Sequence, residues 1–126
     1  MKILLSPYLI LALSLAPSMA SASPQGAPCG TFPPTHVVSA PQTVEQIERQ
    51  EMAEIAHWRK FREDLPNVPF GFGNAEWVAF KKAVKRGDQI VRYRSSDHSW
   101  QHLAGQSGLA LVRTGCIVKN MVTLVN

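Results

Sequence analysis

The sequence lacks the short motifs that identify many enzymes. Among its 126 residues there is no glycine-rich phosphate loop, no dinucleotide-binding fingerprint and no G-x-S-x-G nucleophile motif. Gly71-Phe72-Gly73 is too short to count as either glycine-rich motif. A chain of this length has room for only one small domain. The sequence therefore excludes a multidomain enzyme, it names no reaction, and we expect no cofactor.

The sequence also lacks an apolar run long enough to cross a membrane. Its longest run, Ile3–Ala16, has about 14 residues, whereas a spanning helix needs about 20. The run follows the positively charged Lys2 and precedes small residues, which is the pattern of a secretory signal peptide. We predict cleavage after Ala22, with no transmembrane segment afterwards. Removing 22 of the 126 residues leaves 104, and the loss of Lys2 lowers the formal net charge from +4 to +3.

Cysteine is scarce, with only Cys29 and Cys116 in the chain. Cys29 follows Pro28 well beyond the apolar run, so it does not fit the lipidated cysteine of a lipoprotein, and no twin-arginine signal is present. An even number of cysteines in an exported chain typically pairs. A Cys29–Cys116 disulfide would stabilise the fold by up to about 4 kcal/mol, because it closes a long loop. The alternative, a reactive thiol, lacks a neighbouring histidine in sequence. We expect a periplasmic or secreted protein.

Residues 23–42 are predicted to form a proline-rich leader ahead of a single domain at residues 43–126. Five prolines in the leader disfavour a helix and favour extended chain. We predict one short strand at residues 35–39. The leader would otherwise be loose, so the predicted disulfide would tie it to the C-terminal part of the chain.

The first long periodic segment predicts a helix over residues 44–65. Thr43 and Gln46 form a capping-box pattern at its start, and the next proline stops it. Its helical wheel places Glu51 and Arg62 inside the apolar stripe. Either the helix overhangs the core at these positions or the two charges face a partner.

A second helix is predicted over residues 75–86, with Asn74 as its cap and Gly87 at its end. The period then changes to that of extended chain. Strands are predicted at residues 89–94, 108–113 and 116–125.

Two connections join these strands. Thr114-Gly115 predicts a tight hairpin between the last two. In the longer connection, Ser96 or Asp97 could cap a single helical turn that places Trp100 and Leu103 inward.

The predicted fold class is α+β: two helices followed by a three-stranded antiparallel meander, with one face of the sheet covered by the helices. The other face of the sheet would be free. The last strand carries apolar residues on both faces, so the second face should not be fully exposed to solvent. That face is a candidate surface for a partner.

Histidines four residues apart offer one possible chemical site. His98 and His102 have metal-ligand spacing on a helical turn, and Asp97 precedes them. A catalytic zinc needs three protein ligands, and a third would have to be Asp97 or one of the distant His36 and His57. A solvated turn is the competing interpretation.

Basic residues offer a second possible site. Lys82, Lys85, Arg92 and Arg94 lie close in sequence, and Trp100 follows them. We predict these five as binding residues. Export argues against nucleic acid and favours an envelope protein or an anionic envelope component. A helix end and sheet edge kept soluble by charge is the competing interpretation.

The last forty residues resemble a group of small exported proteobacterial proteins of uncharacterised function. The residues that carry the resemblance are Gly87-Asp88, Ile90, Tyr93, Ser95, Ser99-Trp100, Leu103-Ala104-Gly105, Gly108, Ala110-Leu111-Val112-Arg113, Gly115, Ile117-Val118, Val122-Thr123 and Asn126. The resemblance implies no catalytic residue. The predicted order of elements is similar to that of the outer-membrane assembly lipoprotein fold and of related periplasmic inhibitors, although the lipidated cysteine is missing. By analogy this favours a binding role.

Together these observations predict a non-catalytic binding, inhibitory or accessory module for an envelope partner. The alternative is a small metal-dependent or hydrolytic enzyme that uses Asp97, His98 and His102. A packed part of about 80 residues makes a disulfide a structural need and leaves little scaffold for a preorganised active site.

Overall fold

The computed structural model describes residues 29–126 as an α+β fold, which confirms the predicted class. The predicted signal peptide, its cleavage site and the first part of the leader lie outside the described residues. In chain order the elements are β1 (Val37–Val38), α1 (Val44–Trp58), the 3-10 turn η1 (Gly71–Gly73), α2 (Asn74–Ala83), β2 (Gln89–Arg94), α3 (Asp97–Gln101), β3 (Gln106–Arg113) and β4 (Cys116–Val125).

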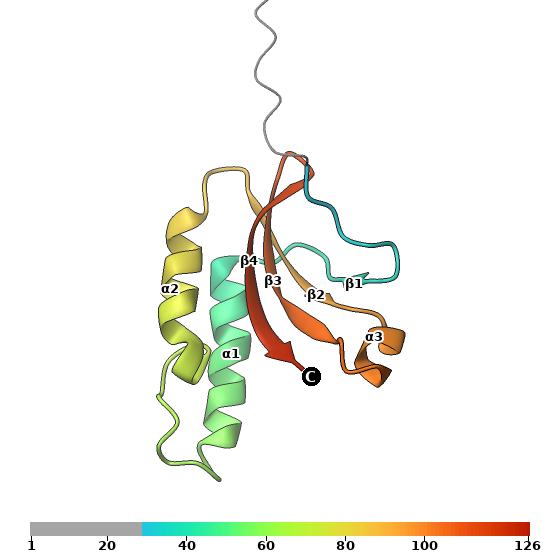
Figure 1. Cartoon of the computed structure of the whole chain (residues 1–126). Coiled ribbons are helices and arrows are strands. Elements are labelled where there is room, and N and C mark those ends of the chain that lie inside the picture. The colour runs from blue at the N-terminus through green and yellow to red at the C-terminus, as the bar shows by residue number, and fades with distance from the viewer. Residues whose placement is uncertain (1–28) are drawn as a thin grey trace, which may run out of the picture.

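The strands form one antiparallel sheet in the order β1-β2-β3-β4 (Figure 1). The prediction of a three-stranded sheet was therefore one strand short, because the leader contributes β1 along the outer side of β2. The hairpin between β3 and β4 is confirmed. Its two turn residues, Thr114 and Gly115, have φ values of 50° and 80°, as a two-residue turn between twisted strands requires.

The first two helices cover one face of the sheet and form the main core with it (Figure 1). The capping box of Thr43 and Gln46 is present at the start of α1. Apolar residues of one helical stripe and of alternate strand positions meet between the layers, as the two periodicities require. The buried members are Ile47, Trp77, Phe80, Ile90, Leu109, Leu111 and Met121.

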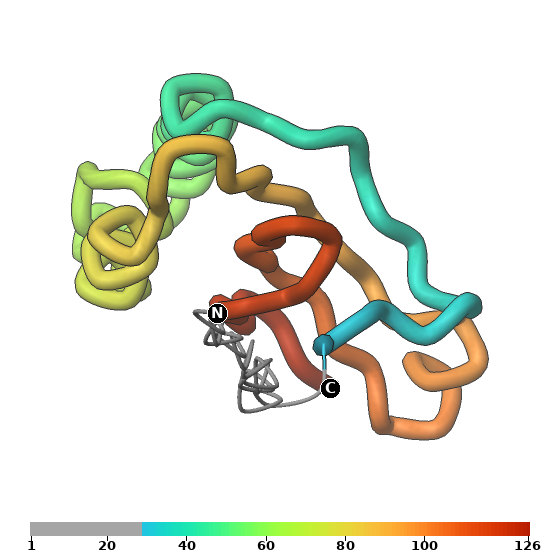
Figure 2. Tube along the Cα trace, turned by 90° about the horizontal axis from the view of Figure 1, so that it is seen from above, coloured from blue at the N-terminus to red at the C-terminus, as the bar shows by residue number. Residues whose placement is uncertain are grey.

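The opposite face of the sheet is not free, which corrects the prediction. The segment after Cys29 crosses it (Figure 2), and we call residues 29–38 the strap. Phe32 packs against Tyr93 with 5.4 Å between ring centroids. The Ile117 amide donates to the Gly30 carbonyl oxygen at 2.8 Å. Val91, Tyr93 and Ala110 of this face are therefore buried within the chain.

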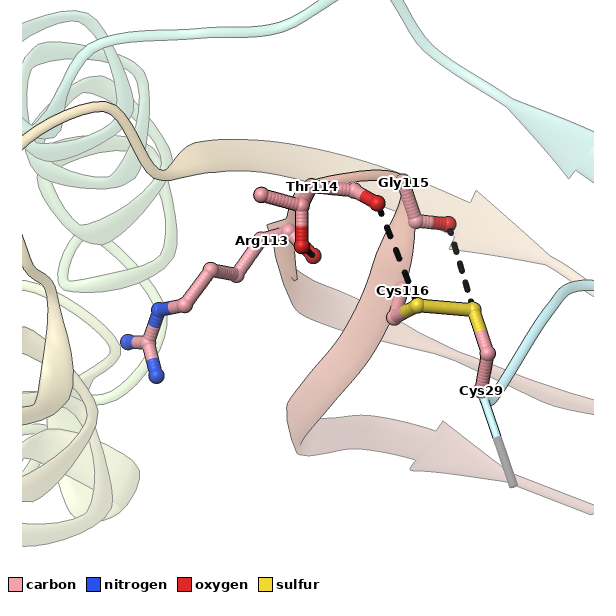
Figure 3. The surroundings of a disulfide bond; sticks show 5 residues. All are labelled: Cys29, Arg113, Thr114, Gly115 and Cys116. Carbon is pink, nitrogen blue, oxygen red and sulfur yellow. Dashed lines mark hydrogen bonds between the residues drawn. A yellow bond between two sulfur atoms is a disulfide. The ribbon is translucent and has the colours of Figure 1, made fainter. Parts of the chain in front are cut away.

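The predicted disulfide joins Cys29 to Cys116 and anchors the strap (Figure 3). Their Cα atoms are 5.0 Å apart, and 87 positions separate them in sequence. Because Cys116 follows the Thr114-Gly115 turn directly, the bridge fixes the strap at one end of the β3–β4 hairpin.

Four local predictions were wrong. The first helix ends at Trp58 instead of residue 65. Tight turns follow it, and the Arg59 guanidinium donates to the Leu65 carbonyl at 2.6 Å, which folds this segment back. Asn74 is the first residue of α2 and not its cap, since η1 leads directly into the helix and the Asn74 side chain donates to the Pro69 carbonyl.

The second helix also ends early, at Ala83. Val84 is already extended, and the Asp88 carboxylate accepts the Lys85 amide at 2.7 Å in place of a further helical bond. The predicted single turn exists as α3, capped by Ser96, but Leu103 is 78% exposed and so does not point inward.

Candidate functional site

The basic residues predicted for binding do not form one patch. Arg92 is engaged inside the fold: its guanidinium donates to Glu51 of α1 at 2.8 Å, to Gln50 at 3.2 Å and to Gln42 at 3.3 Å. This contact ties α1 to β2. It also explains why Glu51 lies in the apolar stripe of its helix, because its partner comes from the sheet.

Arg94 and Trp100 are brought together, as the prediction grouped them. The guanidinium lies over the indole at 4.9 Å from the ring centroid and pairs with Asp97 at 2.6 Å. The indole NH is buried and has no hydrogen-bond partner among residues 29–126. These contacts hold α3 against the end of β2. They also compensate the positive charge of Arg94 within the chain.

Lys82 and Lys85 lie at the other end of the molecule. Lys82 belongs to the last turn of α2, which ends beside the top of the sheet in Figure 1, whereas α3 lies at the bottom. Beside them, Asp88 binds the Arg113 guanidinium with two contacts of 2.8 Å. The Arg113 guanidinium and the Lys85 amide lower the pKa of Asp88 to about 2.

His98 and His102 are also brought together, with 4.0 Å between ring centroids. His102 Nδ1 lies 2.8 Å from the His98 carbonyl oxygen, which orients its ring. Asp97 is engaged by Arg94. Within the described part of the chain, no group of three His, Cys, Asp or Glu side chains gathers as a metal site would need. A metal bound by the two histidines stays a prediction.

One large hollow of the described chain was not predicted. It is a groove of about 890 Å³ between α1, the loop that follows it, the start of α2 and the C-terminal half of β4. We call it the α1–β4 groove. Its lining residues are Glu51, Glu54, Ile55, Trp58, Arg62, Leu65, Phe70, Phe72, Gly73, Glu76, Met121, Val122, Thr123 and Leu124.

The bottom of the α1–β4 groove is built by the loop between the two helices. Phe70 packs on Trp77 of the core with 5.0 Å between ring centroids, although its own φ is 64°, in the left-handed region. Gly71 has a φ of 54°, and a Cβ there would lie 2.7 Å from Leu65 Cδ1 and 3.1 Å from Ile55 Cδ1. The backbone thus approaches the apolar side chains closely, which only glycine permits here.

The rim of the α1–β4 groove exposes large apolar side chains. Trp58 is 53% exposed, Phe72 63% and Leu124 56%. Val122 adds to the rim at 41%. Half-exposed aromatic and aliphatic residues around one hollow are typical of a contact surface rather than of ordinary surface.

Carboxylates make the α1–β4 groove acidic in a chain with a net charge of +4. Of its four charged residues, Glu51 is paired with Arg92, and Arg62 is paired with Asp64 at 2.8 Å. Glu54 and Glu76 take part in no ion pair within residues 29–126, although Glu54 accepts the Trp58 indole NH at 3.2 Å. Two uncompensated negative charges therefore face the hollow.

The sequence contains signals of this groove, but they lie in separate segments and do not by themselves indicate a common site. The last strand is apolar on both faces, and Asn67–Gly73 holds two aromatics between glycines and a proline. Glu51 and Arg62 interrupt the apolar stripe of the first helix. Only the fold shows that these three segments border the same hollow.

Comparisons of the chain with protein-family models, with curated proteins and with solved structures gave no match. The resemblance of the last forty residues to small exported proteins stays a prediction. Across the described residues, no helix combines the length and the apolarity needed to cross a membrane.

Proposed function

We propose that this chain is an exported, non-catalytic binding module that inhibits or assists an envelope protein, and that it holds a segment of that partner in the α1–β4 groove. The groove carries the proposal. Its volume of about 890 Å³ is in the range of known binding sites, about 300–1,000 Å³. Apolar residues make up most of its lining, and the carboxylates of Glu54 and Glu76 are polar groups that could fix the orientation of an occupant.

The backbone of the groove supports this role. A left-handed φ at an aromatic residue costs free energy, and such residues gather at ligand-contacting segments. Phe70 adopts this conformation and lines the groove. Its ring stays packed on Trp77, so the hollow has a rigid floor before any partner binds.

The disulfide supports export. A stable bridge between distant parts of a small domain is typical of oxidising compartments. The strap that it anchors covers the sheet face opposite the helices, so the chain buries that face without a partner. The α1–β4 groove is open to a partner and, at about 890 Å³, is larger than the hollow of about 380 Å³ beside the strap.

Site-specific photo-crosslinking tests the proposal. A photoreactive phenylalanine analogue is placed at Phe72 on the groove rim, or as a control at Thr114, in the exposed hairpin turn at the far end of β4. We expect one discrete adduct from position 72 in cells, lost when Leu124→Glu places a charge on the rim. The crosslinked protein, once purified, should bind the mature chain and bind Leu124→Glu at least tenfold more weakly. The proposal would be contradicted by equal yields of the adduct from positions 72 and 114. It would also be contradicted by an adduct from position 72 that forms equally well in the Leu124→Glu variant.

Metal analysis separates the proposal from the enzyme alternative at Asp97, His98 and His102. The purified mature chain is analysed for zinc beside a His102→Ala variant. One zinc per chain that disappears in the variant would contradict a purely non-catalytic role. We expect the variant to keep the adduct from position 72, because α3 does not line the groove.

A further inference from the structure

The edge of the sheet beside the groove indicates what the groove holds. We infer that its occupant is an extended, positively charged peptide segment of the partner, which pairs with β4 as a fifth strand. This inference rests on the proposed function of the α1–β4 groove and adds the chemistry and the conformation of the segment.

The first observation is the open edge of β4. The sheet ends at this strand, which has ten residues. Gly30 pairs with Ile117 at the beginning of the edge, and no other strand of the described chain pairs with the outer side from Val118 to Val125. Unpaired amide and carbonyl groups along such an edge are a template for another strand.

The second observation is that the two edges of the sheet differ. The opposite edge is β1, which has two residues and is followed by a proline at position 41. Proteins usually block exposed edges with short strands, prolines or charges. The stretch Met121–Val125 has neither a proline nor a charge, and its one irregularity is the register shift at Thr123, so backbone groups along this edge are left able to pair.

The third observation is where the side chains of an added strand would go. Met121 points into the core below α2, and Leu124, opposite Ser107 of β3, lines the groove. Since side chains alternate between the faces of a sheet, every second residue of a strand beside β4 would point to the helix side. There it would meet the hollow that Trp58, Phe72 and Leu124 surround.

The fourth observation is charge. The free carboxylates of Glu54 and Glu76 lie on the helix side of the hollow, at its α1 and α2 walls. Arg62, which also lines it, is neutralised by Asp64 and lies over the Phe72 ring at 5.4 Å. An occupant with lysine or arginine at alternate positions therefore complements the groove, although the chain as a whole is basic.

These observations separate a peptide from other occupants. An acyl chain would use neither the hydrogen-bonding edge nor the carboxylates. A second copy pairing through its own β4 would bring a single charged residue, Lys119, to the contact. A basic, extended segment uses the edge through its backbone. The lysine or arginine side chains on its helix side bring an aliphatic stem to the apolar walls and a cation to the carboxylates.

The test uses synthetic ten-residue peptides and the mature chain with its disulfide intact. The probe alternates valine and lysine. One control peptide replaces lysine by glutamate, and the second keeps the probe sequence but carries N-methyl groups on the backbone edge that would pair. Affinity is measured by calorimetry, and protection of the amides of residues 118–125 by hydrogen exchange. Oligomeric state is followed by sedimentation.

We expect the valine–lysine peptide to bind, to protect β4 amides and to weaken as salt is added. Glu54→Gln and Glu76→Gln should each weaken it by about two- to fivefold, as expected for exposed ion pairs. The matched control Glu45→Gln, in the exposed first turn of α1 and outside the groove, should leave the affinity unchanged.

Several results would overturn the inference and leave the proposed function standing. Equal binding of the N-methylated peptide would exclude strand pairing, and equal binding of the glutamate peptide would exclude the preference for cations. A dimer that protects the same amides without peptide would make the second copy the occupant. Failure of every peptide, with the adduct from position 72 preserved, would also refute the inference. Loss of the groove-dependent adduct would refute the proposed function itself.

Discussion

Removing the disulfide should destabilise the whole fold, and the structure sets the size of the effect. In the double variant Cys29→Ser/Cys116→Ser, a loop spanning 87 positions is no longer closed in the unfolded chain. The chain-entropy estimate for a loop of this length is up to about 4 kcal/mol. Small domains have about 5–15 kcal/mol of unfolding free energy in total. The variant should therefore lose a large part of its stability.

The strap adds a local effect to this global one. At one end the Ile117 amide donates a hydrogen bond to the Gly30 carbonyl, and just beyond the other end the Ser39 amide donates to the Arg92 carbonyl, each at 2.8 Å. Phe32 covers Tyr93 between them. Without the disulfide the strap can open separately from the core, because Gly30 loses the anchor beside it. The Ile117 amide should then exchange with solvent much faster than the amides of β3.

Urea unfolding and hydrogen exchange measure the two effects. We expect the free energy of unfolding to fall by about 2–4 kcal/mol and the midpoint temperature to fall by about 10–25 °C. The matched control Thr31→Ala, an exposed residue of the strap, should change the free energy by less than about 0.5 kcal/mol. A loss below about 1 kcal/mol with unchanged exchange at Ile117 would refute the reasoning, since the strap would then hold without its anchor.

Three further predictions concern the core, the sheet and the response to acid. Phe80→Ala should cost about 3–5 kcal/mol in urea unfolding because Phe80 is fully buried, whereas Val78→Ala on the exposed side of the same helix should cost little. Gly108→Ala should destabilise by about 1–3 kcal/mol because a Cβ there meets the Met121 carbonyl of the neighbouring strand; Gly73→Ala, with its nearest atom at 3.7 Å, is the control, and equal costs for the two would contradict this reason. The pKa of Asp88 is lowered from 3.8 to about 2 by Arg113, so its stabilisation is present above about pH 4 and is lost as the pH falls through 2. Asp88→Asn should lower the free energy of unfolding at neutral pH and make it depend less on pH between 4 and 2. If the free energy of unfolding fell equally in both proteins over this range, Asp88 would not be responsible.

Local features of the fold were predictable because they depend on neighbours in sequence. The capping box at Thr43 and the positive-φ turn at Thr114-Gly115 each involve residues a few positions apart. The disulfide was predictable for a different reason, since two cysteines allow only one pairing.

Element ends were less predictable because tertiary contacts override propensity there. The sequence pattern extends the second helix to residue 86, but Asp88 takes the Lys85 amide while it also binds Arg113 of β3. A bond between positions 25 residues apart in sequence thus helps to end the helix, and no local pattern contains it.

The residues predicted for binding also show that tertiary contacts override what is close in sequence. The sequence groups Arg92, Arg94, Lys82 and Lys85 by proximity along the chain. The fold turns Arg92 towards Glu51 of α1 and Arg94 towards Asp97 of α3, and it leaves the two lysines at the far end. Residues that are close in sequence are therefore far apart in space, because the two lysines lie at or just after the end of α2 whereas the two arginines lie further along, in β2.

The sequence by itself determined the α+β class, the two main helices, the β3–β4 hairpin and the covalent link from Cys29 to the start of β4. These follow from hydrophobic periodicity, from turn chemistry and from the number of cysteines. Only the tertiary structure decided that the strap covers the second sheet face and that an acidic, apolar groove opens beside a free strand edge. Both depend on contacts between segments that are distant in sequence. The packing of these segments determines which apolar residues are buried and which stay exposed to a partner.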